Sequence, residues 1–250
     1  MKRRTLVLMC LAGLLVFLGV LVLYLPASWF AGALPAQVRC SGLGGSIWNG
    51  ECLGLEVQGN RLGDATWNFA SGKAFTGRVS GDVEVRGTAL GARADLDVGL
   101  NGSGELRNIN ARFPLDPAFI AKFPRNQRGT IAANFARVVL TDGPAIGSLQ
   151  GTLELHDFRQ VGGNPLELGS YQVTFDGTPA TDGNVTGQLR DLGGPFMVTG
   201  TVTLSAPSTY LVEGYITGRT ASAERLVREI TLGAAPDASG RSQFSFEGSF

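Results

Sequence analysis

Hydrophobic and polar residues alternate along most of the chain beyond residue 45. In residues 75–86, Val79, Val83 and Val85 lie on one side of an extended strand, and the charged residues lie on the other. The same alternation recurs in residues 92–100, 130–140, 148–158, 171–175, 196–204, 210–217 and 244–247. Turn residues such as Asp176-Gly177 separate these segments. The pattern predicts a mainly β, mostly antiparallel sheet with one apolar and one polar face.

Two short segments have a helical pattern instead. Residues 116–123 begin with an aspartate that can cap a helix and a proline suited to its first turn. Residues 220–232 carry Thr220 or Ser222 as the cap and Leu226 and Ile230 as an apolar stripe. The chain holds 36 glycines, which weaken helix interiors and argue against a helical bundle. We therefore expect two short helices beside a glycine-rich sheet.

Residues 5–25 form an uncharged apolar run that is long enough to cross a bilayer. As a helix the run spans about 32 Å, against a hydrocarbon thickness of about 30 Å. Basic residues precede the run and aromatic residues flank its far end, which predicts a single-pass anchor with a cytoplasmic N-terminus. These candidate membrane-interface residues are Lys2, Arg3, Arg4, Tyr24 and Trp29. The competing interpretation is a signal peptide cleaved at Ala31-Gly32-Ala33, but the apolar core exceeds the roughly 7–15 residues usual there.

The expected organisation has three parts. Residues 1–30 form a cytoplasmic tip and transmembrane anchor, residues 31–44 a linker, and residues 45–250 a periplasmic β domain. The similar surroundings of the two helices suggest related halves at 45–128 and 129–250, although a single continuous sheet would give the same pattern. Three of the 21 basic residues precede the anchor, so the body carries 18 basic and 21 acidic residues. This mildly acidic body has no basic patch for nucleic acid.

Two of the three cysteines, Cys40 and Cys52, lie in the part that we expect outside the cytoplasm. In an oxidising compartment a bond between them closes a ring of about 13 residues and stabilises the fold by on the order of 3 kcal/mol. The alternative is two unrelated thiols that never meet. Because no other thiol lies beyond the anchor, the sequence favours the disulfide.

The chain offers little catalytic chemistry. His156 is its only histidine and lies with Glu154 on the polar side of a predicted strand. No G-x-S-x-G turn provides a nucleophile, and the carboxylates Asp95 and Asp97 have the spacing of any solvated strand face. One histidine and three cysteines argue against a multi-ligand metal site, and no phosphate-binding or dinucleotide-binding motif occurs. We expect a protein that is not an enzyme and has no cofactor.

Trp48 and Trp67 have two interpretations. Tryptophan is enriched at the centres of protein interfaces, which makes both residues candidate partner contacts. Packing within the fold is the more common fate of a tryptophan on a strand. Both interpretations remain open at the level of sequence.

Short motifs in a fixed order run through nearly the whole chain. They are LPASW at 25–29, SGLGGSIWNG at 41–50, LGSY at 168–171, DLGGPF at 191–196, YITGR at 215–219, and GR at 240–241 through FEG at 246–248. With these motifs the chain resembles the type II secretion system protein N (general secretion pathway protein N) family. The resemblance implies an inner-membrane accessory component of the machine that moves folded proteins from the periplasm across the outer membrane. It implies no catalytic residue.

A tethered scaffold fits both the residues and the resemblance. We expect the anchor to contact membrane lipid and the β body to contact the secretin or the inner-membrane platform subunits. The alternative is an AsmA-like envelope protein that binds or conducts lipid along the apolar face of a one-sided sheet. A long uncovered apolar groove would favour that alternative. A third hypothesis, a periplasmic hydrolase, needs His156 in a cleft beside a nucleophile.

Overall fold

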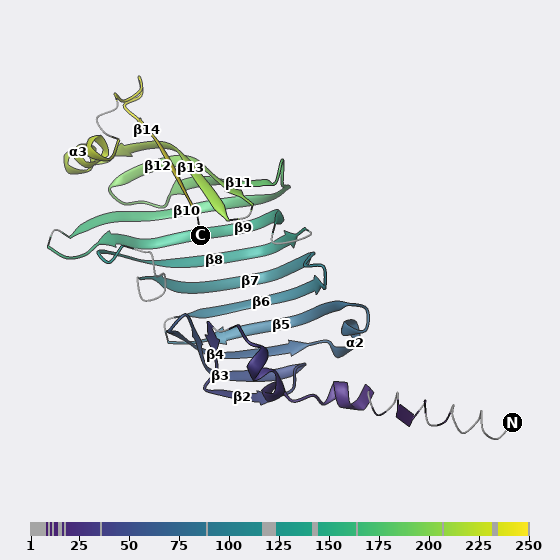
Figure 1. Cartoon of the computed structure of the whole chain (residues 1–250). Coiled ribbons are helices and arrows are strands. Elements are labelled where there is room, and N and C mark those ends of the chain that lie inside the picture. The colour runs from purple at the N-terminus through teal and green to yellow at the C-terminus, as the bar shows by residue number, and fades with distance from the viewer. Residues whose placement is uncertain are drawn as a thin grey trace.

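A computed structural model of the chain describes residues 9, 11, 13–14, 17, 19–35, 37–88, 90–116, 124–141, 145–163, 165–206, 208–231 and 235–249. These residues form one 14-stranded antiparallel sheet, in which each strand from β3 to β14 pairs with the next along the chain (Figure 1). The strands are β1 (Val38–Arg39), β2 (Gly42–Gly45), β3 (Asn49–Val57), β4 (Asn60–Phe69), β5 (Arg78–Arg86), β6 (Gly91–Gly99), β7 (Gly104–Leu115), β8 (Gln127–Leu140), β9 (Ile146–Gln160), β10 (Leu166–Pro179), β11 (Asn184–Asp191), β12 (Phe196–Ser205), β13 (Thr209–Gly218) and β14 (Ser242–Ser249). The helical elements are η1 (Ala27–Ala33), α2 (Ser71–Ala74) and α3 (Ala221–Ile230).

The prediction of a mainly β, antiparallel body is confirmed. Every segment with clear alternation lies on a strand, and β3, β4, β7 and β11 are strands that the alternation did not single out. The segment expected as a linker, residues 31–44, holds β1 and most of β2, which both pair with β3. The sheet is continuous across residues 128 and 129, the expected boundary between halves, because both lie within β8.

Helix α3 is the second of the two predicted helices, and Thr220 is its cap. The Thr220 side chain accepts a hydrogen bond from the Ala223 backbone N–H at 3.2 Å. The predicted stripe was wrong for Ile230, which is 49% exposed, because the buried residues of α3 are Ala223 and Val227. The small Ala223 side chain lets the helix pack closely on the end of the sheet. The other predicted helix lies outside the described residues, apart from its first position.

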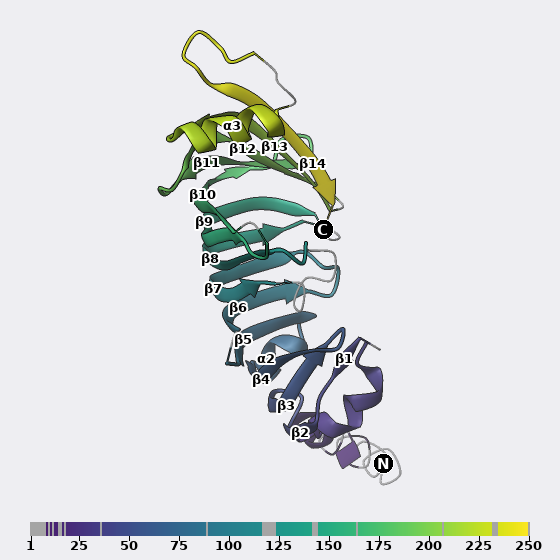
Figure 2. The same cartoon turned by 90° about the vertical axis from the view of Figure 1, so that its left-hand side faces the viewer.

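The sheet is twisted and bowed along its length (Figure 2). Gly200 on β12 lies opposite Gly214 on β13. A Cβ atom at Gly200 would lie 2.9 Å from the Cα atom of Gly214, and closer still to the Glu213 carbonyl oxygen. Only glycine permits this approach, and the pair therefore lets the two strands close in on the apolar side of the sheet.

The core forms on one face of this curled sheet. One cluster joins Val138, Leu149, Val173, Phe175 and Val185, and the Phe135 and Phe175 rings meet at 6.2 Å between centroids. A second cluster packs Phe196 and Val198 against α3. Because the side chains of the first cluster come from strands of one sheet, curvature rather than a second layer buries them.

The anchor is expected at residues 5–25, of which the structure describes a part. Within the described residues, no helix is both long and apolar enough to cross a membrane. Lys2, Arg3 and Arg4 lie outside the described residues. Tyr24 and Trp29 are described, and their side chains are 77% and 71% exposed.

Candidate functional site

One face of the sheet is apolar along most of its strands. Residues paired across neighbouring strands lie on the same face, so the register assigns each side chain to one face. Residues on the apolar face include Val83 and Val85 of β5, Leu96 and Val98 of β6, Ile109 of β7, Phe135 of β8, Leu153 and Leu155 of β9, Val173 of β10, Leu189 of β11, Val202 of β12, Val212 of β13, and Phe244 and Phe246 of β14. The set forms one continuous apolar strip that crosses the strands.

This apolar strip is only partly covered. Helix α3 packs on it at Phe196 and Val198. In the described part of the chain, the substantial contacts of β6 to β9 are with other strands alone. Leu153 remains 36% exposed in the middle of the strip and Phe246 52% exposed at its end. We call this partly exposed strip the apolar trough.

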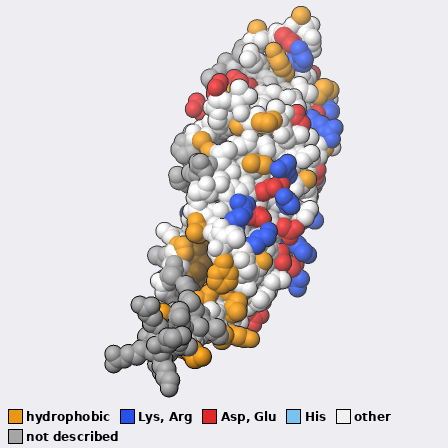
Figure 3. All heavy atoms as spheres, turned by 90° about the vertical axis from the view of Figure 1, so that its right-hand side faces the viewer, with side chains coloured by type: hydrophobic (Ala, Val, Ile, Leu, Met, Phe, Trp, Pro, Cys, Tyr) orange, Lys and Arg blue, Asp and Glu red, His pale blue; other side chains and the backbone are white. Residues whose placement is uncertain are grey.

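The opposite face of the sheet, which we call the charged face, carries ion pairs within and between its strands. Asp97 accepts hydrogen bonds from Lys73 at 2.9 Å and Arg78 at 2.6 Å, and these partners hold the pKa of its carboxyl below the usual value. Glu105 pairs with Arg107 and with Arg137, each at 2.6 Å. Hydrogen bonding from Arg107 lowers the pKa of Glu105. Charged side chains of both signs gather along one flank of the molecule, and hydrophobic ones gather toward the N-terminal end (Figure 3).

His156 belongs to a chain of hydrogen bonds on the charged face. Its Nε2 atom lies 2.8 Å from a carboxylate oxygen of Glu154, as the sequence predicted for two residues on one face. Gln172 donates to the other Glu154 oxygen at 2.6 Å, and Arg190 donates to Gln172 at 2.8 Å. The described hydrogen bonds of His156 involve no serine or cysteine. No group of three or more His, Cys, Asp or Glu side chains suited to a metal occurs among the described residues.

An ion pair joins the end of β11 to the start of α3. Asp191 accepts from Arg219 at 2.7 Å and from the backbone N–H groups of Gly193 and Val198. Burial raises the pKa of Asp191, but the hydrogen bonds from Arg219 and the backbone outweigh it and lower the pKa overall. Burial likewise raises the pKa of the nearby Tyr171 hydroxyl to about 12. The pair fixes the end of the trough next to α3.

The two candidate tryptophans use their indole N–H groups within the chain. Trp48 donates to the carbonyl oxygen of Val22 at 2.9 Å, and Trp67 donates to that of Ile47 at 3.1 Å. The backbone N–H of Ile47 also donates to the Leu25 carbonyl oxygen at 3.1 Å. We call this set of contacts the N-terminal clamp, because it ties residues 22–25 to the turn before β3.

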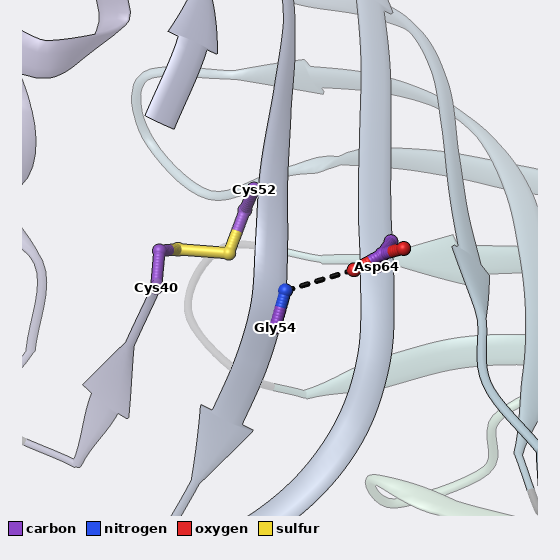
Figure 4. Close-up of a disulfide and its surroundings, with 4 residues drawn as sticks. All are labelled: Cys40, Cys52, Gly54 and Asp64. Carbon is purple, nitrogen blue, oxygen red and sulfur yellow. Dashed lines mark hydrogen bonds between the residues drawn. A yellow bond between two sulfur atoms is a disulfide. The ribbon is translucent and has the colours of Figure 1, made fainter. Parts of the chain in front are cut away.

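Cys40 and Cys52 are joined by a disulfide (Figure 4). Their Cα atoms lie 5.4 Å apart, which suits such a bond. Cys40 lies between β1 and β2, and Cys52 lies on β3 with only 3% of its surface exposed. Beside the bond, the Gly54 backbone N–H donates to Asp64 at 2.8 Å. The disulfide therefore holds the short first strands of the sheet against β3.

Comparison with known proteins connects this architecture to one family. A model of the family described as "Type II secretion system (T2SS), protein N" matches residues 36–245. The chain belongs to this family. The match covers β1 to β13 and part of β14, so nearly the whole sheet lies within the matched region. No curated protein and no solved structure matches the chain.

Membership makes the chain a component of the type II secretion system, which indicates a location in the cell envelope. It also implies interaction with other subunits of that system. For a type II secretion protein N, the surfaces available for contact with another subunit are the apolar trough, the charged face and the sheet edges. The sequence predicted the apolar and polar faces of the sheet and the shared face of Glu154 and His156. It missed the clamp on Val22 and the bonds from Gln172 and Arg190, because these depend on which strands lie side by side.

Proposed function

We propose that this chain is a non-enzymatic scaffold of the type II secretion system, anchored in the inner membrane by residues 5–25. Its N-terminus lies in the cytoplasm and its β body in the periplasm, where it links the inner-membrane platform to the outer-membrane secretin. The proposed parts are the anchor at residues 1–30, the segment 31–44 that joins the anchor to the sheet and contributes β1 and most of β2, and the β domain at 45–250. Tyr24 and Trp29, both exposed, lie at the membrane interface in this proposal.

The order of the strands is the observation that carries the proposal. Twelve steps between neighbouring strands separate β1 from β14. At a spacing of about 4.8 Å, the sheet extends about 60 Å from its first strand to its last. Because the chain never doubles back, its N-terminal end and β14 lie at opposite ends of the sheet (Figure 1). A body of this form reaches away from the membrane that holds its N-terminal end.

Two further features support a periplasmic scaffold. The Cys40–Cys52 disulfide is a bond that oxidising compartments maintain and that the cytoplasm reduces. The charged face presents carboxylates and guanidinium groups in rows, which suits electrostatic recognition of a protein partner. Since Trp48 and Trp67 both bond within the chain, we propose this charged face, rather than the tryptophans, as the main partner contact.

The test is a secretion assay in a bacterium from which this chain has been deleted. The full chain should restore release of type II substrates into the medium, and so should a variant whose residues 1–20 are replaced by an unrelated apolar segment of the same length and orientation, which keeps Val22 and Leu25 in place. A variant released into the periplasm by a cleaved signal peptide should fail at equal abundance. Full restoration by the released body would contradict the tether, and normal secretion after deletion would contradict the role itself.

A second candidate function rests on the open apolar trough, which is the feature that the lipid-handling alternative requires. Strands β3 to β13 each pair with a neighbour on both sides, so an occupant of the apolar trough needs to offer few hydrogen bonds to the backbone. Hydrocarbon chains meet that condition, and burying them would cover Leu153 and its neighbours.

A photoactivatable fatty acid fed to cells distinguishes this second candidate. If the trough holds acyl chains, lipid adducts map to β9 and fall several-fold in Leu153→Asp. The matched control Thr152→Asp adds the same charge to the polar face of the same strand and should leave the adducts unchanged. Adducts confined to residues 5–25 would contradict lipid binding by the trough.

A further inference from the structure

The two edges of the sheet differ in how they are protected. At the first edge, β1 has two residues and β2 four, and the Cys40–Cys52 disulfide ties this segment to β3. At the last edge, β14 has eight residues and pairs with β13 along its whole length. Within the described part of the chain, no strand lies on the outer side of β14. The sheet is therefore protected at one end and open at the other.

Strand β14 also has few of the features by which proteins protect an edge. Its sequence, SQFSFEGS, has no proline or lysine, and Glu247 is its only charge. In an antiparallel edge strand, alternate residues direct their N–H and C=O groups away from the sheet. Gln243, Ser245 and Glu247 are exposed on the polar side, and Phe246 is 52% exposed on the apolar side. This edge is suited to receive one more strand.

We propose that β14 binds an extended strand of another envelope protein, which continues the sheet by strand addition. The bound strand alternates apolar and polar residues. Its apolar side chains lie beside Phe244 and Phe246, whose ring centroids are 5.5 Å apart, and a basic side chain lies opposite Glu247. The choice of partner rests on the proposed function. A scaffold that is tethered at its N-terminal end meets a second protein at its far end, where β14 lies.

A second copy of this chain fits the edge less well. Antiparallel pairing of two β14 strands about Ser245 would set Phe244 opposite Phe246 of the copy without opposing like charges. However, it would carry the two N-terminal ends to opposite extremes of a joint sheet about 120 Å long. Two anchors in one membrane would then hold the sheet along the membrane instead of letting it project. We therefore assign the edge to a different protein.

Site-specific photocrosslinking tests the proposal in the full-length chain, in the bacterium that carries it. A photoreactive residue replaces Gln243, Ser245 or Glu247, one at a time, and mass spectrometry locates the crosslinked residue of the partner. Strand addition predicts one protein, crosslinked at sites that step by two residues for each step of two along β14. The control position Thr199 is exposed on the polar side of the interior strand β12 and should give none of these adducts.

The other outcomes overturn the proposal. Crosslinks to residues 243–247 of this chain itself identify a second copy as the occupant. Scattered sites without a two-residue step, or no adduct from β14, contradict strand addition. The secretion assay with the deleted and restored chain is a separate measurement, so the scaffold role can stand while the edge proposal fails.

Discussion

The indole N–H of Trp48 donates a hydrogen bond to the carbonyl oxygen of Val22 at 2.9 Å. Val22 lies within the apolar run expected to cross the membrane, and Trp48 lies in the turn that opens β3. The neighbouring bond from Ile47 to Leu25 reinforces the contact. The sheet is thus joined to the end of the expected anchor by hydrogen bonds as well as by the chain between them, which suits a scaffold that must keep its direction.

Replacing Trp48 with phenylalanine should loosen the N-terminal clamp. The variant keeps an aromatic ring but loses the N–H donor, at a cost of about 1 kcal/mol. We expect faster amide exchange at Ile47, whose N–H bonds to Leu25, and earlier protease cleavage between residues 25 and 35. Trp29→Phe is the control, because Trp29 is 71% exposed. Equal exchange at Ile47 in wild type and Trp48→Phe would contradict the clamp.

Removing the disulfide should destabilise the sheet at its first edge. The double variant Cys40→Ala/Cys52→Ala frees a ring of about 13 residues, and we expect a loss on the order of 3 kcal/mol in the free energy of unfolding. Thermal unfolding of the two proteins, each with and without reductant, provides the measurement. Reductant should lower the melting temperature of the wild type alone, and no response in the wild type would count against a bonded pair.

The alternation along the chain was enough to predict an antiparallel sheet with one apolar face, but not all of its strands. The alternation did not predict strand β7, because Asn108, at φ 49°, interrupts the register of β7 with β6. Leu106 and Ile109 therefore share a face at a spacing of three. Strand β3 has a similar shift between Cys52 and Leu55. Such bulges move the hydrophobic residues out of the period of two on which the prediction depends.

The sequence could predict a contact between side chains only where the two residues are close together on one strand. Glu154 and His156 are two apart on one strand, so their shared face followed from the sequence. Arg219 and Asp191 are 28 residues apart, and their contact depends on a helix and a turn meeting beside β12. The clamp between Trp48 and Val22 depends on a segment folding back onto the sheet, for which spacing along the chain gives no signal.

The pair of Asp191 and Arg219 should make stability depend on pH in the acidic range. Because the pKa of Asp191 is lowered in the folded protein, its contribution is complete above the unfolded value of about 3.9 and is lost as the pH falls through the lower folded value. Asp191→Asn should cost about 2 kcal/mol at pH 7 and flatten the loss of stability below pH 4. The exposed Glu229→Gln serves as a control in denaturant titrations. An unchanged acid limb in Asp191→Asn would contradict this assignment.

The contact between Gly200 and Gly214 should tolerate no side chain. Gly200→Ala puts a Cβ atom against the backbone of β13, and we expect a loss of about 2 kcal/mol in the free energy of unfolding. Gly91→Ala is the matched control, since Gly91 also lies on a strand but has open space where its Cβ would be. Equal stability of the two variants in chemical denaturation would show that the sheet does not depend on the glycine pair.

The scaffold account is tested most directly by crosslinking from the two faces of the sheet in intact cells. A photoreactive residue replaces His156 on the charged face in one strain and Leu153 in the apolar trough in another, and mass spectrometry identifies what each one captures. The account predicts that the His156 position captures the secretin or inner-membrane platform subunits. Phospholipid adducts from Leu153, with no secretion subunit captured from His156, would contradict the scaffold and favour lipid binding.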